Sequence, residues 1–338
     1  MEHVTLPELD YPFPSAISEH ADEIHRSTLT WVERNGLVSG DRALRLLDTT
    51  GLGRLVARTH PDSSLEDLRI ISDWYTWLFL QDDMRDEAEV GRHPGELSEV
   101  DARFLDLLEG AEPTDLDTPL ARALHDLYRR LRSCLHENDL SDVWMRRLVR
   151  AVGEHLEATL WEAANRARGV APDPETYVRM RPLTGGLSIV TELVEIVEGS
   201  HLPQEVRDHP AVRRLTDASH NVTCWANDVL SLEKELRYSE VNNLVVVLRD
   251  AHALSLQEAL NLAVAMHDAE VGSFAELSGR LPRFGRAVDA KLERYVSSLR
   301  NRMRGVLDWS RESRRYRAAK GSVPAVTEGG LATGVRKR

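Results

Sequence analysis

Apolar residues recur at three- and four-residue spacing along nearly the whole chain, which is the periodicity of amphipathic helices. Short breaks that carry glycine or proline separate these stretches. The pattern predicts helices over residues 20–35, 40–55, 64–80, 96–110, 118–137, 141–168, 174–199, 204–236, 255–281 and 283–316. The run Leu244–Leu248 has strand propensity, but helical sequence flanks it on both sides, so we expect a helix there too.

The domain organisation follows from the same pattern. No strand-turn-strand alternation, repeat period or low-complexity linker interrupts it, so the sequence predicts one all-α domain over residues 19–318. Residues 1–18 are rich in proline and predict an extended arm, a candidate lid. Residues 319–338 are expected to form a disordered tail.

Composition narrows the class of protein. The chain has 338 residues, of which 42% are hydrophobic and 29% charged, as in globular proteins. A net charge of −12 argues against nucleic acid and against an anionic membrane surface as partners. Two cysteines cannot form a disulfide framework or a four-cysteine zinc site. With neither a signal peptide pattern nor a long apolar run, we expect a cytoplasmic protein.

The first candidate site is the stretch Gln81–Glu87, which carries five charges directly after an apolar run. Asp82 and Asp86 lie four positions apart and share a helix face, with Asp83 beside them. Like charges at this spacing repel unless a cation lies between them, and Mg²⁺ is commonly bound by carboxylates together with phosphates. A solvated acidic helix end is the alternative interpretation.

The second candidate site is a polar stripe of Asn227, Ser231 and Glu235, which recur every four residues. At about 100° per residue, the three lie within roughly 80° of one helix face. Their amide, hydroxyl and carboxylate oxygens are ligands that hard cations accept. Lys234, next to the stripe, could reach an anion. The alternative is an ordinary polar helix face, although an apolar stretch precedes it and buried polar groups need partners.

Together these residues resemble the class I terpene synthases (terpene cyclases) of bacteria, in particular the sesquiterpene synthases. The family pattern is DDxxD/E followed about 140 residues later by NDxxSxxxE, and here the two read DDMRD and NDVLSLEKE. The family's C-terminal Arg-Tyr pair is present as Arg315 and Tyr316, and its diphosphate-sensing arginine, 46 residues before the asparagine, is Arg181. In the family, this arginine is followed by a linker residue, usually an aspartate, and by a small residue called the effector. Here the linker is Thr184, which departs from the usual aspartate, and the effector is Gly185.

The resemblance extends from about Pro12 to Tyr316 and implies a single-domain helical bundle around a deep apolar active-site cavity. It implies three Mg²⁺ ions between the two motifs and the diphosphate of a prenyl diphosphate substrate. The metal ligands would be Asp82, Asp83, Asp86, Asn227, Ser231 and Glu235. The diphosphate would be bound by Arg181, Lys234, Arg315 and Tyr316.

The implied reaction is the Mg²⁺-dependent ionisation of a linear prenyl diphosphate, with farnesyl diphosphate as the first choice, and cyclisation of the carbocation to a terpene hydrocarbon or alcohol. Aromatic faces can stabilise a passing cation. Phe79 lies three residues before Asp82, and Trp309 lies seven before Tyr316, so both are expected to line the cavity, with core packing as the alternative. Gly185 would present a backbone carbonyl to the cation.

Three alternatives stay open at this point. A diterpene synthase would use geranylgeranyl diphosphate in place of farnesyl diphosphate. A chain-elongating prenyl diphosphate synthase would carry a second aspartate-rich motif where this chain has Asn227, Ser231 and Glu235. A catalytically silent helical protein would bind the metal and the diphosphate without turnover. A homodimer is the expected assembly if the chain is not a monomer.

Overall fold

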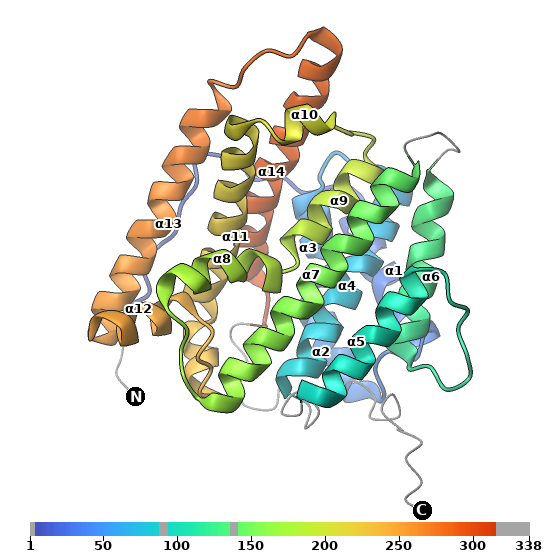
Figure 1. The fold of residues 1–338 in the computed structure, drawn as a ribbon, viewed down its shortest axis with the longest axis horizontal. Coiled ribbons are helices and arrows are strands. Elements are labelled where there is room, and N and C mark those ends of the chain that lie inside the picture. The colour runs from blue at the N-terminus through green and yellow to red at the C-terminus, as the bar shows by residue number, and fades with distance from the viewer. Residues whose placement is uncertain (1–3, 88–93, 136–140, 316–338) are drawn as a thin grey trace, which may run out of the picture.

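The computed structural model describes residues 4–87, 94–135 and 141–315, with the side chains of Asp86, Glu87, Pro94, Glu96 and Ser141 left out. These residues form fourteen helices and no strand (Figure 1). The helices are α1 (Ala21–Arg34), α2 (Asp41–Thr50), α3 (Leu52–Thr59), α4 (Leu65–Glu87), α5 (Pro94–Leu108), α6 (Pro119–Cys134), α7 (Ser141–Arg168), α8 (Pro174–Thr184), α9 (Leu187–Val197), α10 (Gln204–Arg207), α11 (Pro210–Arg237), α12 (Leu244–His252), α13 (Leu256–Ser278) and α14 (Arg286–Glu312). The predicted all-α fold is confirmed.

Glycines divide two of the predicted helices. The segment 40–55 breaks at Gly51, whose φ of 73° ends α2 in the left-handed region that favours glycine. The segment 174–199 breaks at Gly185 and Gly186, and Gly186 has a φ of 66°. The run Leu244–Leu248 lies in α12, so tertiary context overrides its strand propensity.

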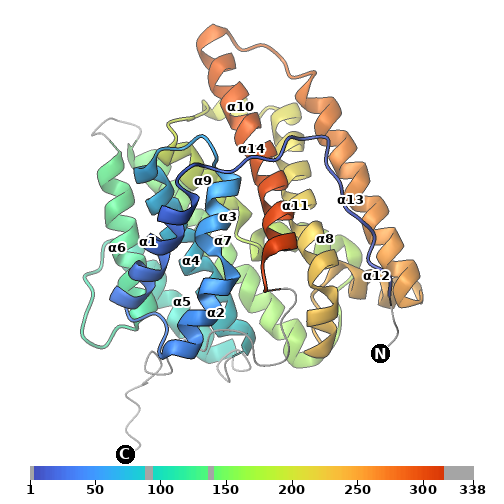
Figure 2. The ribbon, with the colours of Figure 1, turned by 180° about the vertical axis from the view of Figure 1, so that it is seen from behind.

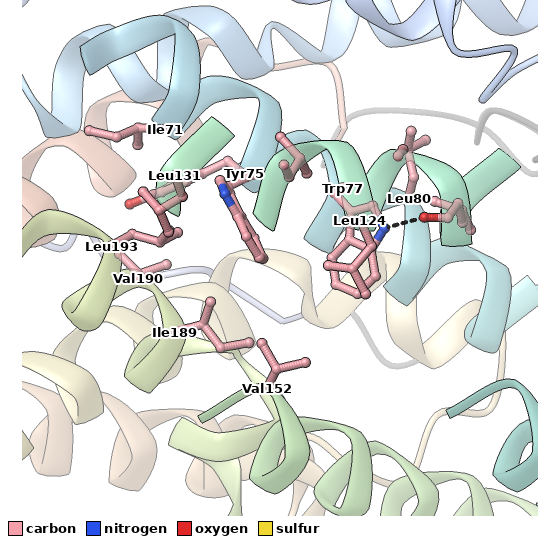
Figure 3. Packing of buried hydrophobic residues seen from close by; sticks show 14 of the residues in the cluster. Ile71, Tyr75, Trp77, Leu80, Leu124, Leu131, Val152, Ile189, Val190 and Leu193 are labelled. Atoms are coloured by element: carbon pink, nitrogen blue, oxygen red, sulfur yellow. Dashed lines mark hydrogen bonds between the residues drawn. The ribbon is translucent and has the colours of Figure 1, made fainter. Parts of the chain in front are cut away.

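Helix α4 is the central element of one half of the molecule. Every residue from Ile71 to Arg85 is buried or half-buried, as in a helix that is surrounded on all sides. Trp74 and Trp77 are fully buried, and the indole Nε1 of Trp77 donates to the Leu120 carbonyl at 2.9 Å (Figure 3). The acidic motif therefore continues a rigid helix that the core holds in place.

The apolar core consists of two clusters. The first is built mainly by α1 to α7 and α9, with Trp309 of α14, and the second by the N-terminal arm, α8 and α10 to α14, with Leu187 of α9. Figure 1 shows α1 to α6 towards its right side and α11 to α13 on its left, with α8 over α11 and with α7 and α9 over α3 and α4. In the described residues, no helix is long and apolar enough to span a bilayer.

The described part of the arm, residues 4–18, contains no helix and runs along α13 and across α14 (Figure 2). Its Leu9, Tyr11 and Phe13 side chains are buried in the second cluster, and the Tyr11 hydroxyl lies 2.9 Å from His267 Nε2 on α13. The arm is thus anchored by its side chains, and its role as a lid stays a prediction. Residues 319–338, expected to form a disordered tail, lie outside the described residues.

Candidate active site

A cavity of about 240 Å³ lies between the two core clusters. The first cluster supplies Tyr75, Val190 and Trp309 to its wall, and the second supplies Leu187 and Cys224. One end of the cavity is rich in charged and polar side chains, namely Asp82, Glu162, Arg166, Asn227, Ser231, Lys234, Glu235, Glu240, Asn242 and Arg315. Earlier on α4 the wall is formed by Tyr75, Leu78 and Phe79, and one turn earlier on α11 it is formed by Thr223 and Cys224.

The structure separates the acidic residues of the first motif. Asp82 lines the cavity, where burial and the neighbouring Asp83 raise the pKa of its carboxyl group. Asp83 is only 5% exposed and faces Arg315 instead of the cavity. Asp86 lies near the end of α4, and its side chain is outside the described residues.

Arg315 connects this motif to the aromatic wall. Its guanidinium lies over the ring of Phe79 at 5.0 Å from the centroid, and Phe79 packs edge-to-face on Trp309 at 5.8 Å. Both rings line the cavity, as the sequence predicted, and the Trp309 Nε1 donates to the Thr50 carbonyl. Tyr316, the second residue of the predicted diphosphate pair, lies outside the described residues.

The predicted stripe on α11 faces the same cavity from the opposite core cluster. Asn227, Ser231, Lys234 and Glu235 all line it. Ser231 Oγ donates to the Asn227 carbonyl at 2.7 Å, and Glu235 Oε2 accepts from Asn243 Nδ2 at 2.8 Å. Burial, followed by the charge of Asp228, raises the pKa of Glu235 to about 7. The two motifs, 145 positions apart, are therefore brought to one end of one cavity.

Arg181 is held by the second motif. Its Nε donates to Asp228 Oδ1 at 2.9 Å and its Nη2 donates to Asn227 Oδ1 at 2.9 Å. Asp228, which is 1% exposed, also accepts a hydrogen bond from the Tyr177 hydroxyl at 2.7 Å. The arginine that the sequence singled out thus lies at the cavity wall in a fixed orientation.

The turn after Arg181 carries the predicted linker residue, Thr184, and the predicted effector residue, Gly185. Thr184 Oγ1 lies 3.4 Å from Arg181 Nη1, a weak hydrogen bond where a carboxylate would form an ion pair. Gly185 lines the cavity, and a Cβ atom there would lie 3.1 Å from Cys224 Sγ. Only a residue without a side chain fits against α11 at this point without displacing a neighbour.

Sequence reasoning had not assigned the acidic and basic residues of α7 and of the loop before α12 to the site. Glu162 and Arg166 line the cavity beside Asp82, and burial raises the pKa of Glu162 to about 7. Arg166 Nε donates to Glu240 Oε2 at 2.8 Å, which ties α7 to that loop. The signal that could have found them is the polar spacing of Glu162 and Arg166, four positions apart on one helix face.

The donor set fits a hard divalent cation. Carboxylate, amide and hydroxyl oxygens of Asp82, Glu235, Asn227 and Ser231 line one cavity end. Burial raises the pKa of both acids, and a bound cation would favour their charged forms. Within the described residues, no three His, Cys, Asp or Glu side chains form a metal-binding group. A cation here therefore depends on the amide and hydroxyl oxygens and on oxygens of a ligand.

The fold and the site define an all-helical enzyme whose cavity has apolar and aromatic side chains in one part and, at one end, oxygen ligands and cationic side chains suited to a metal and an anion. The profile of terpene synthase family 2, C-terminal metal binding, matches residues 73–272. The chain is 38% identical to the farnesyl-diphosphate-cyclising (+)-T-muurolol synthase of Roseiflexus castenholzii, over 91% of this chain and 93% of that one. It is 32% identical to the germacrene A synthase of Nostoc punctiforme, over 94% and 96% of the two chains.

A solved structure gives the same result. The crystal structure of linalool/nerolidol synthase from Streptomyces clavuligerus superposes with a TM-score of 0.79 at 28% identity, covering 90% of this chain and all of that one. The chain belongs to the terpene synthase family, and it is a terpene cyclase, a carbon–oxygen lyase. The family implies a divalent metal. The resemblance drawn from the sequence motifs is thereby confirmed.

Proposed function

We propose that the enzyme ionises farnesyl diphosphate in a Mg²⁺-dependent reaction and cyclises the resulting carbocation to a sesquiterpene, with release of diphosphate. The observation that carries the proposal is the meeting of Asp82 on α4 with Asn227, Ser231 and Glu235 on α11 at one end of a cavity that also has apolar and aromatic side chains in its wall. Similarity to enzymes named for sesquiterpene products, among them the farnesyl-diphosphate-cyclising T-muurolol synthase, supports the C15 substrate.

We assign the metal to these four residues, with three Mg²⁺ ions as the expected number and Asp83 and Asp86 in supporting places. When bound, the ions supply positive charge that stabilises the leaving diphosphate. Arg181, Lys234 and Arg315 line the same end and would donate hydrogen bonds to the phosphate oxygens, together with Tyr316. Arginine suits this task because its planar guanidinium matches phosphate oxygens and stays protonated.

We infer that the inner wall of the cavity stabilises the carbocation. Phe79 and Trp309 present aromatic rings to the cavity, and Gly185 forms the wall beside Arg181. Each desolvated aromatic face contributes roughly 2 kcal/mol to stabilising a nearby cation. We expect Phe79, Trp309 and the Gly185 carbonyl to guide the cyclisation, while Arg181 acts on the diphosphate.

The decisive experiment is an incubation of the purified protein with Mg²⁺ and, separately, with C10, C15 and C20 prenyl diphosphates, with EDTA added to a matched control. We expect a cyclic C15 product in the organic layer, detected by gas chromatography with mass detection, and no product with EDTA. A cyclic C20 product would instead identify a diterpene synthase. A longer prenyl diphosphate in the aqueous layer would identify a chain-elongating enzyme.

Absence of turnover with all three substrates would leave a silent metal- and diphosphate-binding protein.

The assembly is a separate proposal: we expect a homodimer, and sedimentation velocity of the full chain measures it directly.

A further inference from the structure

Arg302 is a buried cation in the wall of the same cavity, and none of the proposed metal or diphosphate contacts uses it. It lies on α14, is 4% exposed and lines the cavity together with Tyr75, Thr223 and Cys224. Its Nη1 donates to Thr191 Oγ1 at 3.0 Å, and its Nε has no hydrogen-bond partner. In the described residues no carboxylate forms an ion pair with it, and its electrostatic neighbours are Tyr75, Tyr295 and Cys224.

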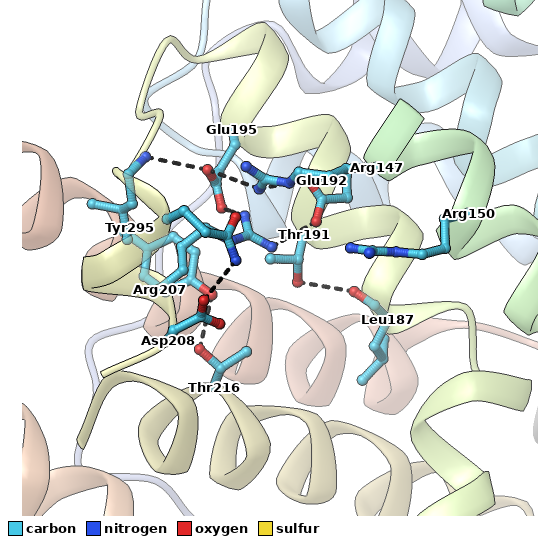
Figure 4. Close-up of polar contacts among 12 residues, drawn as sticks. Arg147, Arg150, Leu187, Thr191, Glu192, Glu195, Arg207, Asp208, Thr216 and Tyr295 are labelled. Carbon is cyan, nitrogen blue, oxygen red and sulfur yellow. Dashed lines mark hydrogen bonds and ion pairs between the residues drawn. The ribbon is translucent and has the colours of Figure 1, made fainter. Parts of the chain in front are cut away.

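The other buried arginines of the described chain are compensated. Arg85 pairs with Asp101, and Arg147 pairs with Glu192 at 2.7 Å. Figure 4 shows Arg147 within a cluster of buried ion pairs that includes Glu192 and Glu195. Thr191, which accepts the hydrogen bond from Arg302, directly precedes Glu192 on α9 (Figure 4). Because a buried charge without a partner is costly, the fold keeps Arg302 unpaired at a price in stability.

The position of Arg302 is the inner end of the cavity. Tyr75 precedes Asp82 by seven residues on α4, which places it about 10 Å along the helix from the acidic end. Thr223 and Cys224 likewise precede Asn227 by about one turn of α11. A prenyl chain whose diphosphate occupies the acidic end would place its hydrocarbon part towards Arg302. A hydrocarbon offers no acceptor to the guanidinium.

We propose that Arg302 holds a water molecule at the inner end of the cavity, and that this water is the nucleophile that ends the reaction, so that the product is a terpene alcohol. The inference rests on the proposed function. A guanidinium only donates hydrogen bonds, so it binds one lone pair of the water oxygen and leaves the other free. A protonated guanidinium is not itself a nucleophile, whereas a carboxylate at this place would be alkylated.

The chemistry of this step is balanced. The free lone pair of the water oxygen forms a C–O bond to the carbocation, which leaves an oxonium ion. The oxonium ion gives up one proton to solvent water, the released diphosphate takes up one proton from solvent at the acidic end, and the terpene alcohol results. Overall, one prenyl diphosphate and one water give one terpene alcohol and one protonated diphosphate. The positive charge of Arg302 keeps the carbocation one water molecule away from the guanidinium.

The test compares products of wild type, Arg302→Met and Arg302→Lys with farnesyl diphosphate and Mg²⁺ in ¹⁸O-labelled water. Methionine fills a similar volume without a donor, and lysine keeps a cationic donor. The matched control is Arg300→Met on the same helix, since Arg300 lies over the ring of Phe13 and does not line the cavity. Diphosphate release measures the ionisation step separately.

We expect the wild type to give mainly an ¹⁸O-labelled alcohol. Arg302→Met should lower the ratio of alcohol to hydrocarbon at least tenfold while diphosphate is still released, and Arg302→Lys and Arg300→Met should retain the alcohol. A wild type that makes only hydrocarbons, or an unchanged ratio in Arg302→Met, overturns the inference and leaves the cyclase assignment intact. If Arg302→Met does not fold, Arg302→Gln is judged by the same ratio. No diphosphate release by wild type from any prenyl diphosphate removes both proposals.

Discussion

Arg315 and Asp83 lie 232 positions apart and form a two-point ion pair, with Nη2 at 2.7 Å from Oδ1 and Nη1 at 3.2 Å from Oδ2. The pair ties the end of the described chain to the acidic motif of α4. Since both carboxylate oxygens of Asp83 are engaged, the neighbouring Asp82 is the acid of this motif that the structure shows free to face the cavity. Adjacent aspartates in one motif thus have different surroundings.

This difference predicts different outcomes for two matched variants. Asp82→Asn should lower kcat/KM by a factor on the order of 100 and raise the Mg²⁺ concentration needed for half-maximal rate, because a cavity-facing charge is lost. Asp83→Asn should lower kcat/KM about tenfold with nearly unchanged Mg²⁺ dependence, because it frees Arg315. Mg²⁺ titrations of the steady-state rate measure both, and equal shifts in the two variants would contradict the assignment.

Asp228 lies next to the proposed metal ligand Asn227 but binds Arg181 instead. We therefore predict that Asp228 positions Arg181. Asp228→Asn keeps the size of the side chain but removes the charge that orients Arg181, so kcat/KM should fall roughly 10- to 100-fold. Tyr177→Phe removes only the hydroxyl that donates to Asp228 and serves as the control, with an effect of a few-fold. If kcat/KM were the same in Asp228→Asn as in wild type, Arg181 would not need its anchor.

We predict that the folded protein loses stability in acid because the carboxylate of Glu198 becomes protonated. Burial alone would raise the pKa of Glu198, but hydrogen bonds from His60, Ser63 and Ser298 outweigh it and hold the pKa at about 2. The folded-state pKa is therefore below the unfolded value of 4.5, so the contribution to stability is present above pH 4.5 and is lost as the pH falls towards 2. Its size is on the order of 3 kcal/mol.

Urea denaturation at a series of pH values between 6 and 3 measures this effect, with Glu198→Gln as the reference. The difference in unfolding free energy between wild type and variant should shrink as the pH falls. A difference that does not depend on pH would show that the carboxylate charge is not what the three donors stabilise.

We predict that the close contact between α14 and α3 requires a glycine at position 305. A Cβ atom there would lie 2.6 Å from the carbonyl carbon of Arg58, so Gly305→Ala must push the two backbones apart. We expect a loss of about 1–3 kcal/mol in unfolding free energy, measured by urea denaturation. Gly272→Ala on α13 meets nothing within 4 Å and should be stabilising by about 0.5–1 kcal/mol. Stability unchanged in Gly305→Ala would mean that α14 can move freely on α3.

The sequence predicted those features that depend on local periodicity. The four-residue spacing of Asn227, Ser231 and Glu235 placed them on one face, and the structure brings that face to the cavity. It did not predict the break at Gly51 within a continuous helical pattern, because one glycine is tolerated in a helix and the left-handed turn depends on tertiary packing.

Arg302 shows why the remainder could not be predicted. In the stretch from Arg300 to Arg304, three arginines alternate with other residues and resemble a solvated helix face. Burial of the middle one follows from the packing of Thr191 on α9 and Tyr75 on α4, which are more than a hundred positions away. Its lack of an ionic partner depends on where every nearby acid lies, which no local pattern contains.

The placement of the cavity between two separate apolar clusters has a consequence for evolvability. Several wall residues, such as Thr184, Gly185, Thr223 and Arg302, belong to neither cluster. Changes at Thr184 or Thr223 can therefore reshape the space in which the prenyl chain folds without emptying either core. A lineage built on this scaffold can explore new terpene skeletons by point mutation while each half of the molecule keeps its own packing.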